Sequence, residues 1–272
     1  MRYITPFKGQ PVAVMTSSKL FFLDSDKLQQ LAHERHGQYT EAEPFPHVVI
    51  DNLFSEEVLR ALIREFPRPG EIDWNQFNNR EERKLASTRE AQMGEMTRLF
   101  LYQLNSSVFI EFLETLTGIN GLIPDPHFWG GGLHQIERGG YLKIHADFNK
   151  HERLNLDRRL NLLLYLNEDW KQEYGGYLEL WDRQMTRSVQ RILPVFNRCV
   201  IFSTTDYSYH GHPDVLECPV GETRKSLALY YYSNGRPAED VSGDHGTLFK
   251  KRPDEKVTGL PSRIKAKLIG RK

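Results

Sequence analysis

The spacing of apolar residues changes near Pro124, and this change limits the folds that the chain can adopt. Before it, apolar residues recur at helical spacing over 58–66, 96–104 and 108–116. After it, short runs typical of strands follow one another, separated by glycine pairs and by Pro194. Helical segments followed by many strands predict a mainly β fold with flanking α-helices, either a sandwich or a jelly roll. The expected strands are 128–135, 141–145, 160–167, 177–181, 189–193, 198–203 and 224–232.

The part of the chain before Pro124 predicts fewer elements. We expect a short helix near 25–35, a strand at 47–50, and a helix that Ser55 caps and Pro67 ends. Residues 68–89 are polar and highly charged, so we expect a long loop there.

His145 and Asp147 lie two residues apart at the end of an expected strand. Residues i and i+2 of a strand point to the same face, so one imidazole and one carboxylate can reach one ion. A second histidine would complete the two-histidine, one-carboxylate set that suits iron(II) and leaves positions open for oxygen and a bidentate ligand. The sequence offers His210 and His212, which follow a later strand. Because a histidine two residues before an aspartate is common by chance, the prediction depends on the whole set.

Arg224 lies on the last expected strand, fourteen residues past His210. A guanidinium can hold a carboxylate through two parallel hydrogen bonds, so Arg224 is a candidate for binding a dicarboxylic acid. Ser226 has the same parity on this strand and can assist. Tyr165 offers a phenol to the same carboxylate, although an aromatic residue in a strand can also serve core packing. On a neighbouring strand, 134–135 (a histidine and a glutamine) can border the site.

The stretch from about 130 to 232 resembles the prolyl 4-hydroxylase-like branch of the 2-oxoglutarate/iron(II) oxygenases, in particular bacterial and fungal relatives of the ribosomal prolyl hydroxylases. The segment PFPHVVIDNLFSEE resembles the usual start of the catalytic domain, so the resemblance covers about 44–233. It implies a double-stranded β-helix, a jelly-roll core. The similar segments are GGYLKIHADF, RRLNLLLYLNEDW, GGYLELWD, PVFNRCVIFSTTDYSYHGHP and RKSLALYYY.

The resemblance assigns the iron ligands to three residues, His145, Asp147 and His210. It favours His210 over His212, which would be a loop histidine beside Pro213. Arg224 matches the basic residue that pairs with the distal carboxylate of 2-oxoglutarate, and Tyr165 matches a tyrosine that hydrogen-bonds this carboxylate in oxygen-sensing prolyl hydroxylases. The implied cofactors are iron(II), 2-oxoglutarate and O2, with ascorbate as a supporting reductant. Because related halogenases have a small residue where Asp147 stands, hydroxylation is expected rather than halogenation.

The expected reaction is hydroxylation of an unactivated C–H bond, with a prolyl or other amino-acid residue of a peptide or protein as the substrate by resemblance. The expected loop 68–89 would overhang the mouth of the site, where its charges can meet a substrate, and the alternative is a solvated surface loop. A free amino acid or another small metabolite is the alternative substrate. Two other classes are a non-catalytic jelly-roll binding module and a cupin-like metal protein such as an isomerase. The complete ligand set and Arg224 argue against both.

The chain is expected to have three parts, an N-terminal extension (1–43) packing on the core, an oxygenase domain (44–235) and a basic tail (236–272). Residues 250–272 carry a charge of +7, whereas the whole chain has a net charge of zero. A basic segment can bind nucleic acid, but a solvated tail with a short amphipathic helix near Ile264 is the simpler interpretation. We therefore expect residues 250–272 to lie outside the barrel, and no nucleic-acid partner.

Composition favours a cytoplasmic protein. No apolar run reaches 18 residues, so no membrane span is expected, and the first residues, MRYITPFKGQ, lack a signal-peptide pattern. The two cysteines, Cys199 and Cys218, are too few for a disulfide framework and are typical of a reducing compartment.

Overall fold

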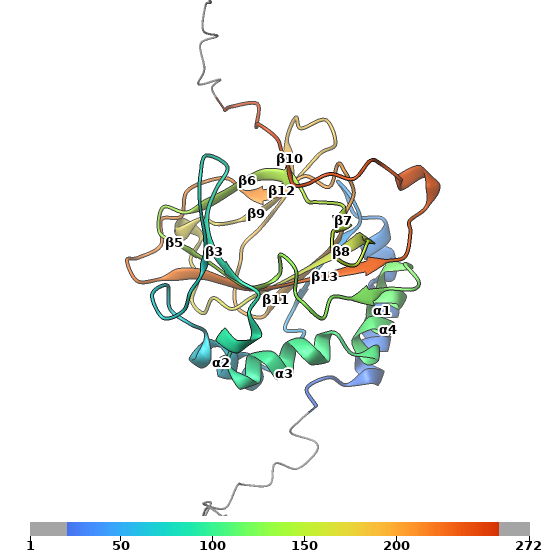
Figure 1. The fold of residues 1–272 in the computed structure, drawn as a ribbon, viewed down its shortest axis with the longest axis horizontal. Coiled ribbons are helices and arrows are strands. Elements are labelled where there is room, and N and C mark those ends of the chain that lie inside the picture. Colours follow the sequence, from blue (N-terminus) through green and yellow to red (C-terminus); the bar gives the residue numbers. More distant parts are fainter. Residues whose placement is uncertain (1–20, 256–272) are drawn as a thin grey trace, which may run out of the picture.

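The computed structural model describes residues 21–255, in which strands predominate and four α-helices come early in the sequence (Figure 1). The helices are α1 (Ser25–Thr40), α2 (Glu56–Glu65), α3 (Glu95–Leu104) and α4 (Ser107–Thr117), with short 3-10 turns η2 (Glu90–Gln92), η3 (Gln172–Tyr174) and η4 (Ala238–Asp240). The strands are β1 (His47–Asp51), β2 (Asn75–Asn78), β3 (Glu82–Ser87), β4 (Ile123–Pro124), β5 (Gly132–Glu137), β6 (Tyr141–Ala146), β7 (Lys150–His151), β8 (Leu156–Tyr165), β9 (Leu178–Trp181), β10 (Ser188–Ile192), β11 (Arg198–Ser203), β12 (His210–His212), β13 (Thr223–Ser233) and β14 (Leu248–Phe249). The expected mainly β fold with flanking helices is confirmed.

The strands form one antiparallel sheet in the order β1-β11-β8-β13-β5-β3-β6-β12-β9-β10, with the short strands attached at its sides. The sheet curls, so that β6, β12 and β9 lie opposite β8 and β11, and the helices lie on the outer side of β8, β11 and β13 (Figure 1). A curled sheet of this kind has an inner face that can form a site and an outer face that helices can cover.

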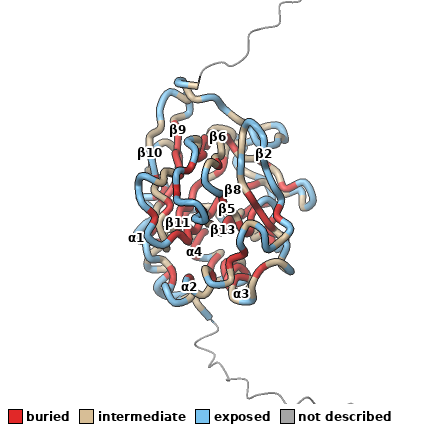
Figure 2. Tube along the Cα trace, turned by 90° about the vertical axis from the view of Figure 1, so that its left-hand side faces the viewer, coloured by how far each residue is buried: buried red, intermediate tan, exposed pale blue. Residues whose placement is uncertain are grey.

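Side chains along β8 point alternately to the outer face and to the inner face of the sheet. Leu160, Leu162 and Leu164 belong to the cluster that the helices share, whereas Tyr165 belongs to a second cluster on the inner face. Buried segments gather in the middle of the molecule along β8, β11 and β13, and exposed residues lie on the peripheral loops (Figure 2). The main hydrophobic core therefore lies between the helices and the sheet, outside the barrel interior.

The helices form where the sequence spacing predicts them. In α4 the apolar residues recur every three or four positions, and those that pack on the sheet are fully buried. Gly118 ends this helix in the left-handed conformation, at a φ of 72°. None of the four helices in the described range has the length and apolar character that crossing a membrane requires.

The expectation of a loop over 68–89 is wrong for 75–78 and 82–87, which are strands. Strands β2 and β3 pair as a hairpin, and β3 also pairs with β5 and β6. All four residues of β2 are exposed, so no apolar alternation marks it as a strand. Strand β3 owes its pairing to partners that lie far away in sequence, which local patterning does not show.

Residues 241–255, termed here the C-terminal strap, run back over the sheet. Within the strap, β14 pairs with β6 and places Phe249 opposite His145. An ion pair of 2.8 Å between Arg252 and Asp214 holds the strap further along. The strap is therefore fixed both at β14 and at Arg252.

The expectation that residues 250–272 lie outside the barrel is wrong at Lys250, whose backbone N–H donates to the carbonyl oxygen of Ile144 on β6 at 2.8 Å. Tail residues are hard to place from sequence, because two strand residues and a few ion pairs carry no periodic signal. The limits of the three expected parts stay predictions, and the helix expected near Ile264 lies outside the described residues.

Gly131, just before β5, lies against the backbone of β13. A Cβ atom there would approach the carbonyl oxygen of Ala228 to 2.5 Å, which is closer than van der Waals contact allows. We expect Gly131→Ala to lower the free energy of unfolding by about 1–3 kcal/mol, because paired strands must move apart. Chemical denaturation measures this. The control is Gly37→Ala in α1, where no atom lies within 4 Å and alanine favours the helix, so stability should be kept or increased. Equal stability of the two variants would contradict the close approach.

Candidate functional site

The side chains of His145, Asp147 and His210 meet inside the curled sheet. Strand β12 pairs with β6 so that His210 lies opposite His145, and Asp147 directly follows β6. The possible ligand atoms of the three residues all lie within 4.8 Å of one another. Asp147 Oδ1 is 3.6 Å from His145 Nε2, and Asp147 Oδ2 is 3.4 Å from His210 Nε2. The group therefore contains the three residues that the sequence singled out, and does not contain His212.

Backbone carbonyls orient both histidines. His145 Nδ1 donates to the carbonyl oxygen of Lys143 at 2.8 Å, and His210 Nδ1 donates to that of Ser208 at 2.9 Å. Because a carbonyl only accepts, Nδ1 carries the proton and Nε2 keeps its lone pair. Metal-binding histidines are held in this way in proteins. The two imidazoles and the carboxylate are thus arranged so that they could hold a divalent cation.

Two side chains of β8 hold the Asp147 carboxylate. Asn161 Nδ2 donates to Asp147 Oδ2 at 2.6 Å, and Arg158 Nη2 lies 3.1 Å from the same oxygen. Asn161 Oδ1 in turn accepts from Arg158 Nε at 3.0 Å. Burial alone would raise the pKa of Asp147, but the positive charge of Arg158 and the neighbouring histidines outweigh it and hold the pKa well below its usual range. The carboxylate is therefore charged in the absence of a metal.

Arg158 is a site residue that the sequence did not indicate. Its side chain is 1% exposed, and its guanidinium carbon lies 3.4 Å from the ring centroid of Tyr230 and 4.3 Å from that of Phe148. Strict alternation from Asn161 would point Arg158 outward. A register shift between β8 and the end of β13 turns it inward instead. Such a shift depends on pairing between distant strands, so the local sequence carries no signal for it.

Arg224 and Tyr165 form a second polar group in the interior. Arg224 is buried, its Nη2 donates to the Tyr165 hydroxyl at 3.2 Å, and its Nε donates to the carbonyl oxygen of Gly176 at 2.9 Å. Burial raises the pKa of Tyr165, against the opposing charge of Arg224, so the phenol stays protonated. Ser226 lies opposite Tyr165 across the β8–β13 pair and is also buried. These residues could hold a carboxylate.

A cavity of about 340 Å³ opens beside Asp147. The β2–β3 hairpin contributes Phe77 and Lys84 to its lining, and the C-terminal strap contributes Phe249. Trp129, which is 44% exposed, lies on another side. The segment that we expected to overhang the mouth of the site does line it, although as a hairpin and not as a loop.

His134 and Gln135 lie side by side on β5 and differ in their surroundings. His134 lines the cavity and faces Ser226 across the β5–β13 pair. Burial, with the nearby charge of Lys84, lowers the pKa of His134 to about 3, so its ring is neutral. Gln135 instead donates to the carbonyl oxygen of Pro67. Of these two neighbours, His134 borders the mouth.

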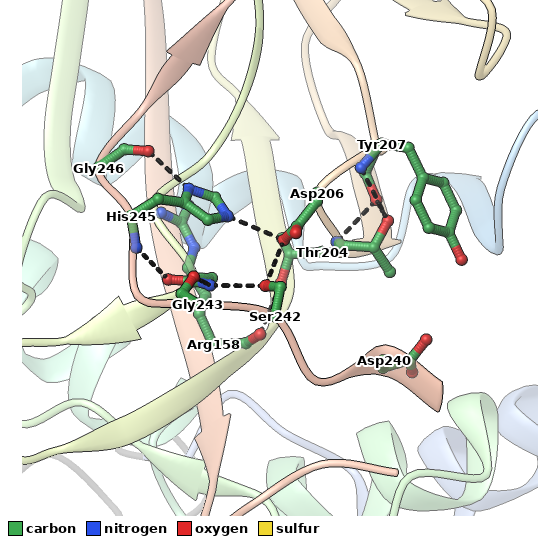
Figure 3. Close-up of polar contacts among 12 residues, drawn as sticks. Arg158, Thr204, Asp206, Tyr207, Asp240, Ser242, Gly243, His245 and Gly246 are labelled. Carbon is green, nitrogen blue, oxygen red and sulfur yellow. Dashed lines mark hydrogen bonds and ion pairs between the residues drawn. The ribbon is translucent and has the colours of Figure 1, made fainter. Parts of the chain in front are cut away.

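The C-terminal strap is fastened close to the site by a network around Asp206, in the loop between β11 and β12 (Figure 3). His245 Nε2 lies 2.8 Å from Asp206 Oδ1, and the Ser242 hydroxyl donates to the same oxygen at 3.0 Å. Asn149, after β6, donates to Ser242 and accepts from the backbone N–H of His245. The strap therefore bridges the two loops that flank the histidine–aspartate cluster, and its Phe249 ring lies 5.5 Å from the ring of His145.

Residues 131–232 match the model of the family described as the 2OG-Fe(II) oxygenase superfamily. Prolyl 3-hydroxylase OGFOD1 of Mus musculus is 24% identical over 200 residues, which are 70% of this chain and 33% of that protein. The chain thus spans about a third of the length of this relative.

Two solved structures are similar in fold. The prolyl hydroxylase of Trichoplax adhaerens, in complex with a peptide fragment of the oxygen degradation domain of hypoxia inducible factor, has a TM-score of 0.53 and 16% identity, with 81% of this chain and 94% of that chain covered. A prolyl-4-hydroxylase of Pseudomonas putida has a TM-score of 0.52 and 17% identity, with 76% and 100% covered. The expected jelly-roll core is confirmed.

Asn161→Leu tests the support of the Asp147 carboxylate. The leucine fills the same space but cannot donate to Asp147 or orient Arg158. We expect the affinity for a divalent cation to fall roughly ten- to a hundred-fold, as it does when such supporting partners of metal ligands are lost. Titration with Mn(II), followed by electron paramagnetic resonance, measures this affinity. Asn78→Leu on the exposed strand β2 is the control and should bind Mn(II) normally. Unchanged affinity in Asn161→Leu would contradict the supporting role.

Proposed function

We propose that the protein is a 2-oxoglutarate-dependent dioxygenase that hydroxylates an unactivated C–H bond, because residues 131–232 match the model of the 2OG-Fe(II) oxygenase superfamily. The observation that carries this proposal is the cluster of His145, Asp147 and His210, with ligand atoms within 4.8 Å of one another. Two histidines and one carboxylate form the donor set that suits iron(II) and leaves positions open for further ligands. We assign iron(II) to these three side chains.

2-Oxoglutarate fits the second polar group of the interior. Its distal carboxylate would meet the guanidinium of Arg224 and the hydroxyl of Tyr165, with Ser226 close by on the same face. The buried charge of Arg224 favours an anion there, because the partners that the structure gives it are the neutral Tyr165 hydroxyl and a backbone carbonyl. When bound, iron(II) and 2-oxoglutarate supply oxygen chemistry in which the co-substrate becomes succinate and carbon dioxide and a C–H bond gains an oxygen atom. Ascorbate would serve as a supporting reductant.

The side chains of the protein contribute orientation, charge and the exclusion of water. The Nδ1 hydrogen bonds of His145 and His210 fix the rings with Nε2 facing inward. Arg158 and Asn161 hold Asp147 in its charged form. The interior is shielded by the β2–β3 hairpin on one side and by the strap on another.

We further propose that the substrate is a prolyl or other amino-acid residue within a peptide or protein. Both the curated relative and the similar structures are named prolyl hydroxylases. The aromatic mouth supports this, because Phe77 and Trp129 are partly exposed around the cavity and can pack on a non-polar ring. A free amino acid or other small metabolite is the alternative. We also propose a cytoplasmic location, because Cys199 and Cys218 are both free thiols.

Succinate formation coupled to substrate oxidation tests the function. Purified protein with iron(II), 2-oxoglutarate and O2 should form succinate, and mass spectrometry should show a gain of one oxygen atom on proline-containing peptides rather than on free amino acids. His210→Ala should lose both products, because two ligands hold iron(II) poorly, while the exposed His33→Ala of α1 should keep them. Wild-type succinate formation in His210→Ala would refute the metal assignment. Binding of Mn(II) and 2-oxoglutarate by the wild type with no succinate under any condition would favour a binding module.

Arg224→Ala should weaken the binding of 2-oxoglutarate by roughly ten- to a hundred-fold, because a charge-assisted pair contributes about 1.5–3 kcal/mol. Arg224→Lys should recover part of the loss, since it keeps the charge without the two-pronged geometry. Calorimetric titration of the Mn(II)-loaded protein measures this affinity. The control is Arg60→Ala, which removes an exposed arginine of α2 and should change nothing. An unaltered affinity in Arg224→Ala would exclude this residue from the co-substrate site.

A further inference from the structure

His212 is a buried histidine for which the described residues provide no hydrogen-bond partner. Its side chain is 3% exposed, and neither Nδ1 nor Nε2 has a partner. Among the described side chains, it alone has two buried polar atoms in this condition. Buried polar groups almost always have a partner, because water that is lost on folding must be replaced. A neutral imidazole offers one donor and one acceptor, so both ring nitrogens of His212 can form a hydrogen bond with a ligand.

The position of His212 places it within the barrel. It lies on β12, two residues after His210, and a register shift in the β12–β6 pair sets it opposite Leu142, which lines the cavity at the mouth. Burial holds the pKa of His212 well below its usual range, so the ring is neutral. His212 lines a cavity of about 420 Å³ together with Gly176, whose carbonyl oxygen accepts from Arg224 Nε at 2.9 Å, so the ring lies close to Arg224.

The surroundings of His212 favour an anion over a cation. Gly176 lines the same cavity as His212, and a Cβ atom added to Gly176 would lie 3.0 Å from Cδ of Arg224, so His212 lies on the Arg224 side of the interior. Arg224 itself has the neutral partners Tyr165 and Gly176. A metal ion beside the positive charge of Arg224 would be repelled, which agrees with the absence of His212 from the metal-ligand cluster within the described residues. A carboxylate between Arg224 and His212 would satisfy both.

We propose that His212 is a co-substrate-binding residue, whose imidazole donates a hydrogen bond to the same distal carboxylate of 2-oxoglutarate that Arg224 holds. The inference rests on the proposed function, because it requires that 2-oxoglutarate binds in this interior. It gives the second histidine of the segment His210-Gly211-His212 a role distinct from that of the first. One histidine binds the metal, and the other binds the remote end of the molecule that bridges from the metal to Arg224.

The test compares His212→Phe with His212→Gln in the full-length protein. Phenylalanine keeps the ring and removes the donor, whereas glutamine keeps an N–H donor. In calorimetric titrations of Mn(II)-loaded protein with 2-oxoglutarate, we expect the phenylalanine variant to bind about ten-fold more weakly and the glutamine variant to recover most of the affinity. The affinity for Mn(II) should be unchanged in both, because the metal cluster is intact. His36→Phe, the same replacement on α1 outside the barrel, is the control and should bind 2-oxoglutarate normally.

A second titration uses 2-oxobutyrate, a 2-oxo acid without the distal carboxylate. If His212 contacts that carboxylate, His212→Phe binds 2-oxobutyrate as well as the wild type does, and the loss is confined to 2-oxoglutarate. An equal loss for both acids would place His212 at the chelating end and overturn the proposal. Wild-type affinity for 2-oxoglutarate in His212→Phe would also overturn it. Failure of the wild-type Mn(II)-loaded protein to bind 2-oxoglutarate would instead reject the proposed function itself.

Discussion

The register of β8 between β11 and β13 is the constraint on which both the fold and the site depend. On its inner face, Asn161 reaches Asp147 at one end and Tyr165 reaches Arg224 at the other. On its outer face, leucines at every second position pack against the helices. A shift of one residue would exchange the two faces, because side chains alternate along a strand. Leucines would then fill the interior, and Asn161 would lie beneath the helices. The same pairing that closes the hydrophobic core therefore sets the two ends of the polar interior.

The interior keeps charged groups out of water, and its two ends balance charge differently. At the metal-ligand end, Arg158 and Asp147 compensate each other before any ligand arrives. This pairing keeps the carboxylate ionised, while the rings of Tyr230 and Phe148 pack against the guanidinium. At the other end, Arg224 is held by neutral oxygens alone. At the metal-ligand end, the charges of Arg158 and Asp147 balance each other, and the ligand atoms are arranged around a place for a cation. At the other end, the charge of Arg224 has no negative partner among the described residues. A dianion that spans the interior would complete the second end.

Much of this arrangement could be predicted from the sequence, because its signals are local. The apolar run in 198–203 and the helical spacing of 108–116 specify elements that the structure reproduces within one or two residues. The spacing of His145 and Asp147 identified two side chains that share a face of one strand. What could not be predicted depends on long-range pairing. The inward turn of Arg158 follows from a register shift, β3 depends on distant partners, and β12 is only three residues long, so His212 was expected in a loop.

The cavity can be completed only after the C-terminal strap has been synthesised, because the strap supplies part of its lining. Phe249 and its neighbours line the mouth, but they follow the three ligand residues in sequence, and β14 pairs with a strand that is synthesised about a hundred residues earlier. As the nascent chain emerges from the ribosome, β6, β12 and β13 are available to fold before the strap exists. The edge of β6 that β14 later occupies is then open to solvent beside His145. The last side of the cavity wall is therefore added only after all three ligand residues have been made.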